Sequence, residues 1–119
     1  MEIKFHVPRS ILVALNQLYE MEQKLKKTED PANLQRNVGK MKDAFQEFGL
    51  AYEDPMGQPF KETRTDLEAT ISGGGTENLI VVEVIKPIIR ATLREGAGEF
   101  SKIIQQGIVV VESRNETTP

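Results

Sequence analysis

The residues of this chain that could take part in chemistry are few and lie far apart in the sequence. The glycine triplet Gly73–Gly75 could bind an anion, because successive glycine amides can form a small anion-binding concavity. A phosphate-binding loop, however, continues with Gly-Lys-Ser/Thr and leads into a helix, whereas this triplet precedes a predicted strand. We therefore interpret the triplet as a turn between two strands.

The titratable and nucleophilic side chains form no recognisable catalytic set. Glu62, Asp66 and Glu68 are close enough in sequence for a pair of carboxylates, but no pattern of burial singles out any of them as a proton donor. His6 has no accompanying Asp or Ser constellation, and Ser101 lacks a nucleophile elbow. Solvated charges and a structural histidine explain these residues better. We therefore expect no enzymatic activity and expect the surfaces of the chain to carry its function.

The composition excludes several classes of protein. The chain has 119 residues, which is one domain by length, and it contains no cysteine and a single histidine, so disulfides, thiolate metal sites and histidine clusters are excluded. A net charge of -3 and the absence of tryptophan argue against a nucleic-acid surface. The sequence lacks both an apolar run of about 20 residues, as a membrane span needs, and the apolar stretch of a signal peptide. We expect a cytoplasmic protein with no cofactor, metal, nucleic-acid or membrane partner.

Residues 1–49 are predicted to form a hairpin of two helices. Apolar side chains recur with helical spacing over residues 11–27, and Ser10 can cap the start of this helix. Asp30-Pro31 marks the start of a second helix, and Gly49 marks its end. The apolar residues of the two helices are Ile11, Leu15, Leu18, Leu25, Leu34, Val38, Met41, Phe45 and Phe48.

Two helices alone make a poor core, because each buries only one side against the other. The apolar residues left over must contact either the second half of the chain or a second copy of it. We favour a homodimer in which two hairpins form a four-helix bundle, and the alternative is a hairpin that folds back on its own sheet. The residues expected at the dimer interface are Leu15, Leu18, Leu34, Val38, Met41 and Phe45.

The second half of the chain is predicted to be a small antiparallel β domain, so the predicted fold class is α+β. Residues 50–59 contain Asp54-Pro55, Gly57 and Pro59, and we interpret them as a hinge. The β domain is expected over residues 60–113, with strands at 67–72, 79–85, 88–93 and 102–112, and the tail 114–119 is expected to fray.

The order of these parts resembles that of the GrpE family, the nucleotide exchange factors of DnaK-type chaperones. The resemblance extends from about Phe5 to Ser113. It comprises the helical hairpin, its Phe48-Gly49-Leu50 exit, a loop ending in Pro59-Phe60, a glycine turn, and the strands NLIVVEVIKP and SKIIQQGIVVVES. The sequence departs from the family at its Phe-Asp-Pro-x-x-His-Glu-Ala signature, of which Phe60 remains, and at its Lys-Gly-Tyr turn, where Lys86-Pro87-Ile88 stands. The long N-terminal helix of the family has no counterpart in this sequence.

The resemblance implies a homodimer joined through the hairpins. It also implies that the β domain docks on the ATPase domain of a DnaK-type chaperone and holds its nucleotide cleft open, without making or breaking a bond. The partner-binding positions that it implies are Phe60, Ile88, Lys102 and Val111, of which Lys102 offers a charge to an acidic surface. The alternative is a place in the core for the three apolar residues and a solvated position on a strand for Lys102.

Two other functions stay open at this point. A structural or adaptor homodimer with a GrpE-like fold and no exchange activity is favoured by the altered signature residues. A small enzyme or ligand-binding domain, with a site between the helices and the sheet, is the least expected of the three.

Overall fold

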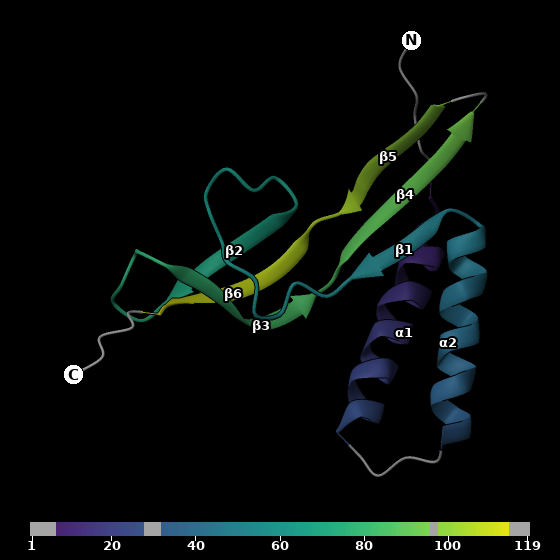
Figure 1. The fold of residues 1–119 in the computed structure, drawn as a ribbon, viewed down its shortest axis with the longest axis horizontal. Helices are drawn as coiled ribbons and strands as arrows, with labels where there is room; N and C mark the ends of the chain where they lie inside the picture. Colours follow the sequence, from purple (N-terminus) through teal and green to yellow (C-terminus); the bar gives the residue numbers. More distant parts are fainter. Residues whose placement is uncertain (1–6, 28–31, 96–97, 115–119) are drawn as a thin grey trace. The chain divides into compact units, whose positions relative to one another are not determined.

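A computed structural model of the chain describes residues 7–27, 32–95 and 98–114, and it places two helices before six strands (Figure 1). This order confirms the predicted α+β class. The elements in chain order are α1 (Arg9–Lys26), α2 (Ala32–Glu47), β1 (Leu50–Glu53), β2 (Leu67–Ser72), β3 (Leu79–Lys86), β4 (Ile88–Glu95), β5 (Gly98–Gln105) and β6 (Gly107–Ser113).

The chain divides into two compact units, each built around a three-stranded sheet. The first unit takes residues 1–52 and 90–104, and it contains both helices and most of the sheet β1-β4-β5. The second unit takes residues 53–89 and 105–119, and it contains the sheet β2-β6-β3. This division differs from the predicted separation after residue 49, because three strands are grouped with the helices.

Helix α1 forms because its apolar side chains recur every three or four residues and line one side. The predicted cap, Ser10, lies inside the helix; the N-cap is Pro8, whose carbonyl accepts the amide of Ile11 at 3.0 Å. Lys24 and Lys26 lie in the last turn, where cations complement the carbonyl end of the helix dipole. The buried residues of the helix are Leu15, Leu18 and Tyr19.

Helix α2 is followed by Gly49, the stop that the sequence predicts. Gly49 has a φ of +94°, and its amide donates to the carbonyl of Gln46 at 3.0 Å. A Cβ atom at this position would lie 2.5 Å from the carbonyl oxygen of Thr92, so both the backbone conformation and the available space require glycine. The predicted start of the helix, Asp30-Pro31, lies outside the described residues.

Residues 50–53 form strand β1, so the prediction of a hinge that begins at residue 50 is wrong for this part. The segment is held in place by β4, since the amide of Thr92 donates to the carbonyl of Gly49 at 2.7 Å. The turn chemistry predicted further along is present, because the side chain of Asp54 accepts the amide of Met56 at 3.0 Å.

The sheet of the second unit is mixed, which corrects the predicted antiparallel domain. Strand β2 runs parallel to β6, with Leu67 opposite Gly107, whereas β3 runs antiparallel to β6 with two irregularities in its register. The buried apolar residues of this unit are Leu67, Leu79, Val81, Ile88, Ile89, Val109 and Val111.

The strand predicted over residues 102–112 is in fact two strands, β5 and β6, which belong to different sheets. Gly107 starts β6 at a crowded position, where an added Cβ would lie 2.8 Å from the side chain of Leu67 and 2.9 Å from that of Ile88. Its amide donates to the carbonyl of Asp66 at 2.9 Å. The sequence marks this break with Gln105-Gln106-Gly107, but the predicted strand continues through these residues.

Turns and chain ends in the second unit follow the sequence more closely. Pro87 separates β3 from β4, as expected of a residue that cannot donate to a strand ladder, and Gly73–Gly75 lies between β2 and β3. Of the predicted frayed tail, Arg114 donates its amide to the carbonyl of Asn78 at 3.0 Å, and residues 115–119 lie outside the described part of the chain.

Candidate functional site

The acidic residues of the loop before β2 do not form a catalytic pair. Both oxygens of Asp66 accept hydrogen bonds from Arg64, each at 2.9 Å. The same guanidinium donates to the side chain of Gln58 and to the carbonyl of Pro59, so Arg64 fixes the loop. The hydrogen bond to Asp66 raises the pKa of Arg64. This carboxylate is therefore engaged in a structural ion pair.

The other residues that the sequence suggested for chemistry are likewise not brought together into a site. The triplet Gly73–Gly75 is a turn, in which Gly75 is packed against the side chain of Ser113. Ser101 is exposed on β5, and His6 lies outside the described residues. Over residues 7–27, 32–95 and 98–114, no group of three or more His, Cys, Asp or Glu side chains is placed to hold a metal ion. No helix in the same ranges has the length and apolar character needed to cross a membrane.

A polar and aromatic cluster joins the two helices to β1 within the first unit. Glu22 accepts hydrogen bonds from the ammonium group of Lys42 at 2.8 Å and from the hydroxyl of Tyr52 at 3.1 Å. The Lys42 ammonium lies 5.1 Å from the centre of the Tyr52 ring, and Tyr19 packs edge-on against that ring with centroids 5.6 Å apart. Burial, together with the charge of Glu22, raises the pKa of Tyr52 above its ordinary value. The cluster fixes the position of the hairpin on β1.

The predicted dimer residues fall into two groups. Leu15, Leu18 and Val38 are 0%, 3% and 3% exposed in a single chain, so they belong to the core of the first unit. This differs from the predicted role, because a side chain already covered by its own chain is not available to a second copy. Leu34 and Met41, in contrast, are 49% and 42% exposed, and Phe45 is half-buried.

The exposed residues of α2 continue into a row that the sequence prediction left incomplete. Leu34, Met41 and Phe48 are spaced by seven residues, which is about two helical turns, so they lie on one side of the helix axis. We call these three residues the apolar row. Phe48 is 81% exposed, and it was omitted from the predicted dimer residues although its spacing continues the row.

The apolar row ends beside a hollow of about 320 Å³. This hollow lies between the start of α1 and the end of α2, and its lining is apolar throughout. The lining residues are Ile11, Ala44, Phe45, Phe48 and Leu50. The side of the hairpin that carries the row is therefore an apolar surface that one chain leaves uncovered.

The four predicted partner-binding residues differ in their exposure to solvent. Ile88 and Val111 are 1% and 0% exposed, so the prediction that they contact a partner is corrected: they form the core of the second unit. Phe60 is half-buried in the second unit, where its amide donates to the carbonyl of Leu79 at 2.8 Å. Lys102 is exposed on β5 and remains available for contact.

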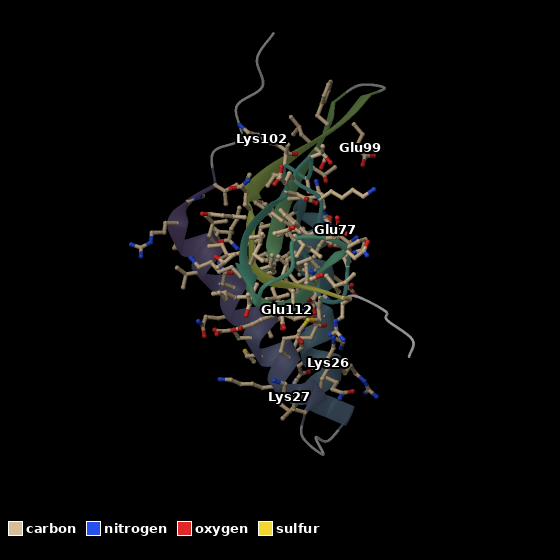
Figure 2. All side chains as sticks on the ribbon, turned by 90° about the vertical axis from the view of Figure 1, so that its left-hand side faces the viewer. Lys26, Lys27, Glu77, Glu99, Lys102 and Glu112 are labelled. Atoms are coloured by element: carbon tan, nitrogen blue, oxygen red, sulfur yellow. The ribbon has the colours of Figure 1, made fainter. Side chains whose placement is uncertain are left out.

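A second hollow in the first unit is larger and carries charge. It has a volume of about 860 Å³ and lies between the end of α2 and the strands β1, β4 and β5. Glu99 of β5 contributes to it, whereas Lys102 lies on the opposite face of the same strand, because residues three positions apart alternate faces (Figure 2). We call this hollow the acidic groove. Its lining residues are Asp43, Gln46, Glu47, Phe48, Gly49, Ala51, Thr92, Leu93 and Glu99.

Comparisons with known proteins leave the family of the chain open. No family model matches it, and no curated protein or solved structure is significantly similar to it. Its function must be inferred from its own surfaces, of which the apolar row and the acidic groove are the most developed.

Proposed function

We propose that this chain is a homodimeric nucleotide exchange factor of the GrpE kind, which acts on a DnaK-type chaperone. The observation that carries the proposal is the apolar row, which one chain leaves open to solvent. A helical hairpin with such a row is suited to pairing with a second hairpin, and a four-helix bundle can cover Leu34 and Met41 of both chains. The order of elements, two helices followed by six short strands, further supports the proposal.

The proposed activity requires no catalytic group. A factor that binds the open, nucleotide-free form of the chaperone more tightly than the closed form shifts the chaperone toward the open form. By linkage, the factor then weakens nucleotide binding by the same ratio. Lys102 supplies an exposed cation on β5 for an acidic surface of the ATPase domain, and Phe60 supplies a half-buried aromatic side chain.

Release of a fluorescent adenine nucleotide from a DnaK-type chaperone tests this proposal. We expect micromolar amounts of the protein to accelerate release, and we expect Lys102→Glu to slow it because the substitution reverses the contacting charge. Lys26→Glu makes the same change of charge on α1 and should retain the acceleration. No acceleration by the unmodified protein would contradict the proposal, as would equal losses in the two variants.

The second candidate is an adaptor homodimer with no exchange activity. The burial of Ile88 and Val111 favours it, because two of the four positions implied by the resemblance are withdrawn from the surface. A dimer that leaves nucleotide release unchanged would support this candidate.

A further inference from the structure

The acidic groove is formed by backbone that is held in place. Its corner is Gly49, whose amide and carbonyl are hydrogen-bonded to Gln46 and Thr92 at 3.0 and 2.7 Å. The groove also has an apolar part, because Phe48 and Leu93 are 81% and 36% exposed. It therefore offers an exposed aromatic side chain beside a hydrophobic one, next to a hydrogen-bonded backbone, and such apolar residues are the usual centre of a protein docking site.

The charged residues that line the groove in the described part of the chain are acidic. Asp43 and Glu47 line it from the end of α2, Glu99 lines it from β5, and none of the residues that line it in the described part of the chain is basic. The last turn of α2 also contains no basic residue. Because the C-terminal end of a helix carries partial negative charge, carboxylates are unfavourable there by about 0.3–1 kcal/mol each, and a cation that binds beside them relieves this repulsion.

We propose that the acidic groove binds a protein segment in which lysine or arginine residues flank a leucine or methionine. The apolar side chain of this segment lies between Phe48 and Leu93, and its cations lie beside Asp43 and Glu47. The charge of the groove selects the basic residues, and its exposed apolar part selects the residue between them. This binding goes beyond nucleotide exchange and does not depend on it.

Fluorescence anisotropy with a labelled peptide, Gly-Ser-Lys-Lys-Leu-Lys-Lys-Ser-Gly, tests the proposal. We expect saturable binding that weakens with salt, and weaker binding when serine replaces the leucine or glutamate replaces the lysines. In the protein, Glu47→Lys should weaken binding by about tenfold, whereas Glu68→Lys, an exposed position on β2 in the second unit, should change it by less than about twofold.

Three results would overturn the proposal. The first is that no labelled peptide binds, and the second is that the two charge reversals weaken binding equally, which would indicate a general effect of net charge. The third is that Glu47→Lys changes the sedimentation mass of the protein, because the groove would then be occupied by a second copy of this chain. Nucleotide release is measured in a separate assay, so the peptide-binding results can be interpreted even if the protein does not accelerate nucleotide release.

Discussion

At the scale of single residues, Gly49 determines how both candidate surfaces are presented. It lies two residues beyond the end of α2 and directly after Phe48, the last residue of the apolar row, and it forms the corner of the acidic groove. Its positive φ is rarely adopted by other residues, and the carbonyl of Thr92 occupies the space that a side chain would need. The direction in which Phe48 projects is therefore set by backbone geometry.

Replacing Gly49 with alanine should lower the free energy of unfolding by more than the conformational penalty alone. The strained φ contributes about 1–2 kcal/mol, and the contact with Thr92 adds to it. Gly57→Ala is the matched control, because Gly57 has a φ of +81° and nothing within 4 Å of an added Cβ. Urea denaturation measures both. Equal losses in the two variants would show that the contact at Gly49 is relieved by a small backbone shift.

Tyr52→Phe should be destabilising at neutral pH by about 1–2 kcal/mol, because Glu22 loses a hydrogen-bond donor. The folded state raises the pKa of Tyr52, so its hydroxyl contributes stability that is complete below the unfolded pKa of about 10 and is lost as the pH rises further. The stability difference between the two proteins should therefore narrow as the pH rises from about 9.5 to about 11.5 in urea denaturation. A difference that stays constant over this range would contradict the assignment.

At the scale of elements, the sequence predicts what local patterns determine. Helical spacing and Gly49 predict the hairpin, and strand β2 is found over the predicted residues 67–72. The sequence does not predict strand β1, because the strand has only four residues and its neighbour β4 lies about 40 residues further along the chain. The parallel pairing of β2 with β6 is likewise set by distant contacts.

The candidate surfaces were partly predictable for the same reason. Leu34 and Met41 follow from helical spacing, and Phe48 could have been added by continuing that spacing by two turns. The burial of Ile88 and Val111 could not be deduced, because apolar residues on a strand have the same sequence pattern in a core and in an interface. The acidic groove was missed because it combines residues from α2, β1, β4 and β5.

The loop before β2 contains no helix or strand, and the side chain of Arg64 holds it in place through hydrogen bonds. Arg64→Met should lower the free energy of unfolding by about 1–3 kcal/mol, because Asp66, Gln58 and the carbonyl of Pro59 all lose a donor. Arg36→Met, at an exposed position on α2, should change it by less than about 0.5 kcal/mol. Chemical denaturation compares the two variants, and similar effects would mean that the Arg64 contacts add nothing measurable.

At the scale of the whole molecule, the exposed apolar residues are unevenly distributed. Single exposed apolar side chains are normal on a protein surface, but a contiguous set indicates an interface. Leu34 and Met41 on α2 and Phe48 just beyond it are aligned on one side of the helix axis, whereas Val13 on α1 is 49% exposed and is displaced from the buried Leu15 by about half a turn. The two kinds of exposed residue give a direct test of which side of the hairpin pairs.

The unmodified protein should sediment at twice the 13.4 kDa of one chain, and Met41→Asp should make it monomeric. Met41 is 42% exposed in one chain, so covering the rest of its side chain contributes about 0.6–1.3 kcal/mol. A symmetric interface loses two such contributions, so the Kd for dimer dissociation should rise by about one to two powers of ten. Val13→Asp introduces the same charge at a similarly exposed position and should leave the dimer intact. A monomeric unmodified protein, or a dimer that survives Met41→Asp and dissociates with Val13→Asp, would show that the apolar row does not join two hairpins.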